Sequence, residues 1–328
     1  MAAKALTALI TILFGIGAAL AVFWLLNKLS ELLPNRWEHR IKPYLYVLPA
    51  YMAITVYLLY PAVLTVFNSF KDRFGKNWIG TENYSKLLGS HAFRQTLFNT
   101  LLWIVIVPAV SVILGLAVAT LADRLKGRQE KFVKTIIFLP MAISLVGAST
   151  VWRFVYYSAP KGVTQIGLQN ALITGLGHDP VPFLQETDFH LNSFFLMAIL
   201  LWAQVGFSMV ILSGAVKGVP AETLEAARID GAAERQVFFK VVVPQIKGTI
   251  ITVLVTVTIG VMKIFDVVYT TTNGNFNTNV IGNEFYNQLT TNSNNGTASA
   301  IVVMLMIAVL PIMVYQVRQF RIQERAAS

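Results

Sequence analysis

Cysteine is absent from the 328 residues of this chain, and histidine is scarce. Without cysteine there is no disulfide, no thiolate metal site and no cysteine nucleophile. The 4 histidines are scattered without the spacing of a His-Glu-x-x-His motif, so a zinc site is not indicated. The chain also lacks a G-x-x-x-x-G-K-[ST] phosphate loop, a G-x-S-x-G nucleophile elbow and a dinucleotide fingerprint. These absences exclude the commonest sequence signatures of nucleotide binding and hydrolysis.

Charged residues are also rare. They make up 13% of the chain, whereas a soluble domain carries about 25%. Hydrophobic residues make up 55%, and the mean hydropathy is +0.61. A helix that crosses a bilayer needs about 20 mostly apolar residues, and runs of this kind fill about half of the chain. We therefore predict a membrane protein without a large soluble domain.

Long uncharged runs predict an all-α membrane protein with about seven transmembrane helices. The predicted spans are Ala5–Leu26, Tyr44–Phe70, Leu97–Leu121, Thr135–Tyr156, Asn192–Val216, Thr249–Thr271 and Ala298–Val317. The first run is longer than the apolar part of a signal peptide, and no convincing cleavage site follows it. We therefore expect a retained helix, with a cleaved leader as the alternative.

Lysine and arginine are distributed unevenly between alternate loops. The loops after predicted spans one, three and five and the tail after span seven contain 17 of these residues, whereas the N-terminus and the loops on the opposite side of the membrane contain 7. Because cytoplasmic loops carry the excess of positive charge, we expect the loop 217–247 and the C-terminus to be cytoplasmic and the N-terminus to be outside. The basic loop 71–97 is an exception to this rule.

The net charge of +10 does not indicate a nucleic-acid partner. No basic run is interleaved with the aromatic residues that a reader of single strands needs. Positive loops that face anionic membrane lipid explain the charge better. The predicted external loops 157–191 and 272–297 are instead rich in Gly, Asn, Thr and Gln, which favours polar contacts with other molecules.

The loop between predicted spans five and six contains two short helical segments. Pro220 suits a helix start, residues 221–229 are mostly good helix formers, and Asp230–Gly231 indicates a turn. A second helix is expected over residues 232–241, ending before Pro244. Apolar residues in a cytoplasmic loop favour a docking surface for another protein. An amphipathic helix lying on the membrane is the alternative.

This loop resembles a known motif. The sequence Glu225-Ala226-Ala227, followed by Gly231 and by Val243-Pro244, is similar to the EAA loop in the permease subunits of binding-protein-dependent ABC importers. Further matches to the carbohydrate-uptake, maltose-type branch lie at Ile79–Tyr84, Trp152-Arg153 and Lys263–Asp266. The segment Thr272–Thr278 departs from the usual Thr-x-Gly-Gly-Pro pattern and resembles permeases for α-glucosides and glucosylglycerol-type solutes.

The resemblance implies a domain organisation and a set of partners. Residues 44–328 would form the permease domain, with the coupling loop at 217–247, and residues 1–43 an accessory helix and cytoplasmic linker. The expected partners are a second homologous permease, an ATPase dimer, an external solute-binding protein, membrane lipid and a sugar. The chain would bind no cofactor, because ATP and Mg would lie on the ATPase subunits. It would be a transport subunit of the bacterial inner membrane and not an enzyme.

In this family the EAA loop docks in a cleft of the ATPase, which implies roles for particular residues. The expected coupling residues are Glu225, Ala226, Ala227, Arg228, Asp230, Gly231 and Pro244. For Glu225 the alternatives are a solvated helix charge and an ion pair with Arg228 three residues along the helix, and Gly231 is better explained by the turn than by a contact.

Sugar passage needs hydrogen-bonding groups and aromatic faces within the membrane. The candidate pathway residues are Trp202, Gln204, Phe207, Ser208, Lys263 and Asp266. Lys263 and Asp266 are three residues apart, so a structural ion pair on one helical face is the favoured alternative for them. Packing or a helix–helix hydrogen bond is the alternative for the others.

A secondary transporter or channel acting without an ATPase is the competing function. It would predict an inverted internal repeat, which the sequence does not show, and it leaves the loop 217–247 without a partner. A membrane enzyme would need a cluster of acid, base or metal-binding groups, and none stands out.

Overall fold

The computed structural model describes residues 2–31 and 35–327, which form two compact units. The first unit ends at Phe67 and the second begins at Asn68. The first unit contains α1 (Ala2–Glu31), α2 (Asn35–Ile54), a π-helical turn η1 (Thr55–Leu59) and all but the last residue of α3 (Tyr60–Asn68). Residues 32–34 of the predicted linker lie outside the described residues.

Helices α1 and α2 pack against each other in the first unit. The rings of Phe23 and Tyr46 stack at 6.0 Å, and the Tyr46 hydroxyl donates a hydrogen bond to Asn27 Oδ1 at 2.9 Å. Most other apolar side chains of this unit are exposed, which is the pattern expected of helices that face lipid.

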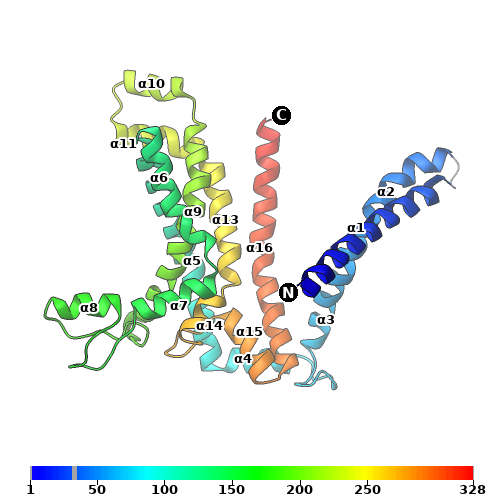
Figure 1. Ribbon diagram of the computed structural model, residues 1–328, viewed down its shortest axis with the longest axis horizontal. Helices are drawn as coiled ribbons and strands as arrows, with labels where there is room; N and C mark the ends of the chain where they lie inside the picture. The colour runs from blue at the N-terminus through cyan, green and yellow to red at the C-terminus, as the bar shows by residue number, and fades with distance from the viewer. Residues whose placement is uncertain (1, 32–34, 328) are drawn as a thin grey trace. The chain divides into compact units, whose positions relative to one another are not determined.

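The second unit is built around two long helices, α5 (His91–Asp123) and α9 (Leu191–Lys217). They lie close together because Gly115 has no side chain: a Cβ at this position would lie 2.6 Å from Ser208 Cβ. Trp103, Leu196 and Met209 are fully buried in the core that these helices share with α13 (Lys247–Met262). Figure 1 shows this bundle with α10 at one end.

Shorter elements surround the bundle. They are α4 (Glu82–Gly89), α6 (Gly127–Phe138), η2 (Leu139–Ala142), α7 (Leu145–Val155), α8 (Leu168–Gly175), η3 (Asp188–His190), α10 (Ala221–Ile229), α11 (Glu234–Gln236), η4 (Val237–Val242), α12 (Val243–Gln245), α14 (Asp266–Thr271), α15 (Ile281–Tyr286), η5 (Asn287–Thr291) and α16 (Asn295–Ala327). We call the end of the unit with α4, α8, α14 and α15 the distal end, because it lies opposite α10 (Figure 1).

The number of membrane spans agrees with the all-α prediction. Within the described residues, 5 helices are long and apolar enough to cross a membrane, or up to 7 if each of 2 bent helix pairs counts as one span. The predicted span Thr135–Tyr156 belongs to one of these pairs, and its prediction as a continuous helix is wrong. The chain bends by 101° between Ala142 and Leu145. Ile143 is extended there, and the Ser144 hydroxyl caps α7 by accepting a hydrogen bond from Gly147 N.

The predicted span Thr249–Thr271 is also interrupted. Helix α13 ends at Met262, and α14 begins at Asp266 after a short non-helical segment. The Ile264 carbonyl lies against Gly282 of α15, where a Cβ would be 2.5 Å away. The Phe265 ring packs on Tyr269 and Tyr286 at 4.8 and 4.7 Å. These contacts favour the break over a continuous helix.

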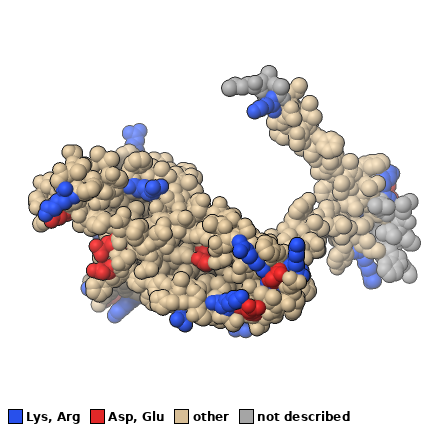
Figure 2. All heavy atoms as spheres, turned by 90° about the horizontal axis from the view of Figure 1, so that it is seen from below, with Lys and Arg blue, Asp and Glu red and all other residues tan. Residues whose placement is uncertain are grey.

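The basic loop 71–97, which breaks the charge rule, is folded rather than open. Arg73 donates hydrogen bonds to the carbonyls of Asn292 and Ser293. Asn83 donates to the Lys71 carbonyl at 2.8 Å, and Thr297 donates to Asn83 Oδ1 at 3.2 Å. In Figure 2, which looks onto this side of the molecule, the charged side chains form small mixed groups on a mostly uncharged surface.

Asparagines also organise the segment after α14. Asn192 donates to the Phe276 carbonyl at 2.7 Å, and Asn99 donates to the carbonyls of Asn277 and Asn279. Both amides are almost fully buried. The sequence predicts a surface for polar contacts here, but several backbone carbonyls of this segment are bound by buried amides of α5 and α9.

Candidate functional site

Helix α10 and the segment that follows it form a compact projection at one end of the bundle (Figure 1). Leu224 of α10 and Phe238 of η4 pack against a small core of Val219, Val242 and Ile246. Because this core holds both arms of the projection, α10 is fixed to the end of the bundle rather than tethered loosely. The predicted helix 221–229 matches α10, and the predicted turn at Asp230–Gly231 is confirmed.

An ion pair closes the turn between the two arms. Arg228 Nε donates to Glu234 Oε1 at 2.7 Å, and Arg228 Nη2 donates to Glu234 Oε2 at 3.4 Å. The hydrogen bond to Glu234, together with the attraction of its negative charge, raises the pKa of the Arg228 guanidinium. Gly231 lies inside the turn with φ +81°, a conformation that disfavours any side chain. Arg228 thus pairs across the turn, and not with Glu225 as the alternative interpretation expected.

The outward face of α10 is exposed in the described chain. Glu222, Glu225, Ala226 and Ile229 recur at helical spacing and are all exposed. Ile229 is 86% exposed, and Phe239 beyond the turn is 58% exposed. An acidic and small-residue face with apolar residues at one end can dock on another protein. Among the other predicted coupling residues, Ala227 is half-buried and Asp230 is exposed.

The second arm differs from its prediction. It does not end before Pro244 but continues to Gln245, with a bend of 69° before α13. Proline cannot donate a backbone hydrogen bond and clashes with the preceding turn. The π-helical segment η4, directly before Pro244, accommodates this by widening the helix. Pro244 is therefore an exposed residue within a bent helix and not a terminator.

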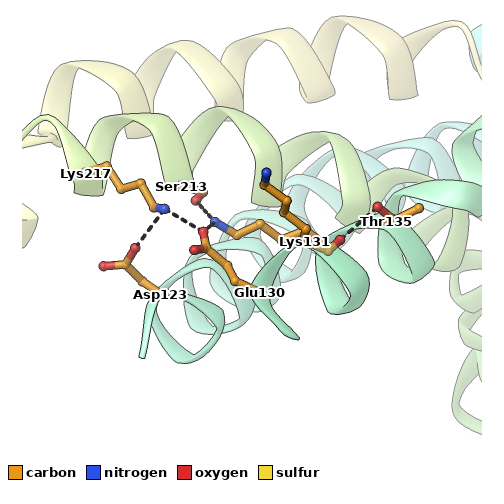
Figure 3. A network of polar contacts seen from close by, with 7 residues as sticks. Asp123, Glu130, Lys131, Thr135, Ser213 and Lys217 are labelled. Atoms are coloured by element: carbon orange, nitrogen blue, oxygen red, sulfur yellow. Dashed lines mark hydrogen bonds and ion pairs between the residues drawn. The ribbon is translucent and has the colours of Figure 1, made fainter. Parts of the chain in front are cut away.

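A cluster of charged residues lies at the root of the projection (Figure 3). Lys217, the last residue of α9, contacts Glu130 at 2.6 Å and Asp123 at 3.4 Å. Glu130 of α6 also pairs with Lys134, which donates to the Ser213 hydroxyl. The charge pattern of the sequence places these lysines in loops and does not indicate the cluster, because Lys217 and Ser213 are distant in the sequence from Asp123, Glu130 and Lys134.

The predicted pathway residues of α9 do not share one environment. The Trp202 ring packs edge-on against Trp152 at 5.9 Å, and Phe207 packs on the main core. Ser208 is fully buried, and its hydroxyl lies 2.8 Å from that of Ser111 on α5. Gln204 is half-buried and has no hydrogen-bond partner among the described residues. Gln204 is therefore the one polar side chain of this group that is free to meet a solute.

Lys263 and Asp266 do not form the predicted ion pair. Within the described chain no ion pair joins them, because Lys263 follows the end of α13 and Asp266 starts α14. Lys263 is exposed and lines an apolar pocket of about 330 Å³ with Phe265 and Tyr286. Asp266 is half-buried in the first turn of α14, where a negative charge is favourable.

A larger cleft of about 740 Å³ opens at the distal end. Its polar lining includes Arg153, Lys161, Asp179, Gln185 and Asn275. Arg153 donates to the Thr270 carbonyl at 3.3 Å, so the end of α7 is joined to α14 beside this cleft.

Comparison with known proteins decides the family. Residues 111–323, which include α9, the projection and α13, match the binding-protein-dependent transport system inner membrane component family. The chain belongs to this family. The protein is therefore a multi-pass permease of the inner membrane, and the resemblance stated from its sequence is confirmed.

Two relatives match most of the chain. The α-glucoside transport system permease protein AglF of Rhizobium meliloti is 42% identical over 95% of this chain and 96% of its own length. The osmoprotective compounds uptake permease protein GgtC of Synechocystis sp. is 44% identical over 86% of this chain and 99% of its own length.

A solved structure supports the fold. One chain of a bacterial alginate ABC transporter, in complex with an alginate pentasaccharide-bound periplasmic protein, has a TM-score of 0.74. The match covers 86% of this chain and 96% of that chain at 21% sequence identity. The arrangement of helices is therefore that of an ABC transporter membrane chain.

Proposed function

We propose that this permease is one half of the translocation pathway of an ATP-driven importer for α-glucosides, glucosylglycerol or similar small glycosides. The observation that carries the substrate class is the identity of 42% over nearly the whole chain to a permease named for α-glucoside transport. The second relative, named for osmoprotective compounds, supports a small neutral solute. The chain itself catalyses no reaction.

The outward face of α10 is the surface that docks on the ATPase. Glu225, Ala226 and Ile229 present a charge, a site of close approach and an apolar contact on one exposed face. Ala227, Arg228, Asp230, Gly231 and Pro244 shape and hold that face. ATP and Mg bind to the partner subunits, because this sequence contains no phosphate loop.

The complete importer contains four further kinds of component. They are a second homologous permease, a dimer of ATPase subunits, an external solute-binding protein and the surrounding lipid. Residues 44–328 form the permease domain, and residues 1–43 form an accessory helix with its linker.

The orientation places α10 and the C-terminus in the cytoplasm and the N-terminus outside. The C-terminal part of α16 runs toward the same end of the second unit as α10, which supports this assignment (Figure 1). The distal end, with its polar cleft, then faces the external binding protein.

The solute passes along α9 and the end of α13. Gln204 supplies a free amide there, and Trp202 and Phe207 supply aromatic surface. Lys263 and Asp266 lie at the distal end of this route, and Ser208 supports it through the contact between α5 and α9. These side chains supply hydrogen-bonding groups and aromatic faces, which the hydroxyls and the apolar face of a sugar need within the membrane.

Competition for uptake tests the substrate class. Cells of a strain that lacks its own permease, complemented with this chain and its partner subunits, are given radiolabelled sucrose. Unlabelled glucosylglycerol and trehalose, both α-glucosides, should inhibit uptake, whereas the β-glucoside cellobiose should not. Uptake that is absent for sucrose but present for glycine betaine would show that the solute is not a glycoside.

A further inference from the structure

The charged cluster of Asp123, Glu130, Lys134 and Lys217 joins three separate helices at one point (Figure 3). Asp123 ends α5, Glu130 lies in the first turn of α6, and Lys217 ends α9. Helix α10 begins only four residues after Lys217. The cluster therefore fixes the point at which the projection leaves the bundle.

Glu130 is the centre of this cluster. Its carboxylate contacts Lys134 and Lys217, and its side chain is only 14% exposed. A surface pair with the same spacing, Glu82 and Lys86, is 48% and 70% exposed. Removal of one partner from a sheltered group of charges leaves the others without compensation, whereas the loss of an exposed pair has little effect. Loss of the Glu130 carboxylate would therefore leave Lys134 and Lys217 without their shared acidic partner at the contact between α6 and α9.

Three other contacts join α9 to the bent pair α6–α7 farther from α10. The Gly206 backbone on α9 lies directly against Ile137 of α6. Beyond the bend, the Trp152 ring of α7 packs on Trp202 of α9, and the Tyr156 hydroxyl donates to the Phe195 carbonyl at 3.0 Å. The bent pair α6–α7 is thus attached to α9 along its length, from the root of the projection to the distal end.

We propose that Glu130 is a positioning residue for coupling, which makes the root of α10 and the bent helix pair α6–α7 move as one body. A displacement of α10 by a partner then reaches α7. It also reaches α14 beside the distal cleft, because Arg153 donates a hydrogen bond to the backbone of α14. This inference rests on the proposed docking of α10 on the ATPase. Without the contacts of Glu130, the root of α10 is held less firmly to α6, and part of its displacement is lost before it reaches α7.

The assembled importer with its binding protein, reconstituted in vesicles, tests this inference. Uptake and ATP hydrolysis are measured together for wild type, Glu130→Gln and Glu130→Asp, with Glu31→Gln, which loses an exposed ion pair to Lys28, as the control. We expect Glu130→Gln to lower the solute moved per ATP by roughly tenfold, within the usual range of coupling between distant sites. Glu130→Asp should recover part of the loss, and Glu31→Gln should equal wild type.

The absence of cysteine from this chain allows a second measurement that does not depend on the stability of one variant. In the double variant Glu130→Cys with Lys217→Cys, the two thiols are joined with a short, cleavable bifunctional reagent, and wild type treated in the same way is the control. Bridging should restore the solute moved per ATP, and cleavage of the bridge should remove it again.

The outcomes separate the two proposals. If the wild-type complex moves no solute with ATP, the proposed function fails. If wild type is active and Glu130→Gln has the same solute moved per ATP, or if the bridge has no effect on an uncoupled double variant, the role of Glu130 is overturned.

Discussion

Gly206 allows the sharpest prediction from packing, because only a hydrogen atom fits between α9 and α6 at this position. A methyl group there would lie 2.5 Å from the Ile137 carbonyl oxygen and 2.7 Å from Phe138 Cα. Ordinary contacts between such atoms need about 3.5 Å, so α6 and α9 would have to separate by about 1 Å. Both obstructing atoms belong to the backbone, so no side chain can turn away.

The expected cost follows from these distances. Forcing an extra methyl group into a packed site costs about 1–3 kcal/mol. For a domain of this size, each 1 kcal/mol lowers the midpoint of thermal unfolding by about 2–4 °C. We therefore expect Gly206→Ala to lower the midpoint by about 2–12 °C, because over-packing outweighs the gain in helix propensity.

Gly214 on the same helix is the matched control. A Cβ at Gly214 would meet nothing within 4 Å, so Gly214→Ala should be neutral or stabilising by up to about 1 kcal/mol. Thermal unfolding of the two variants in the same detergent, followed by size-exclusion chromatography, measures the difference. Equal midpoints for Gly206→Ala and Gly214→Ala would refute the close packing of α6 on α9.

Four further predictions each concern a single residue. Glu225→Lys should leave the permease in the membrane but abolish uptake, since it reverses the charge on the docking face; normal uptake with normal membrane levels would argue against docking through α10. Gly231→Val should impair uptake because a branched residue is strained at φ +81°, whereas Gly231→Asn should keep most of it, and equal uptake by both would contradict the turn. Gln204→Leu should slow solute transport while assembly survives, and an unchanged rate and affinity would remove Gln204 from the pathway. The hydrogen bond from Lys76 N lowers the pKa of the Asp72 carboxylate in the folded loop. Ionised Asp72 therefore stabilises the loop fully above its unfolded pKa of about 3.9, and this stabilisation is lost as the pH falls through the lower pKa of the folded state. Trp78 fluorescence should report the loss in wild type but not in Asp72→Asn.

The apolar runs predicted most of the spans, because a long uncharged segment has few alternatives to a membrane helix. The two breaks in the predicted helices were not predicted, and the physical reason differs between them. At Ser144 a local signal existed, since Pro140 and a capping serine stand close together. At Ile264 no local signal existed, because the break depends on Gly282, which is distant in the sequence.

The projection was predictable to the residue in its first helix, since Pro220, the helix formers and Asp230–Gly231 all agree locally. The partners of its charges were not. Arg228 was expected beside Glu225 at helical spacing, but the turn at Gly231 brings Glu234 closer. Glu130 and the buried amides Asn99 and Asn192 act through contacts between distant segments, which a single sequence cannot indicate.

Uptake by purified components separates an ATP-driven importer from a secondary transporter. The permease is reconstituted in vesicles alone, or with its second permease, ATPase and binding protein, and uptake of a labelled α-glucoside is followed. We expect uptake only from the complete set and only with ATP. Uptake by this chain alone, driven by an ion gradient without ATPase, would contradict the proposed function.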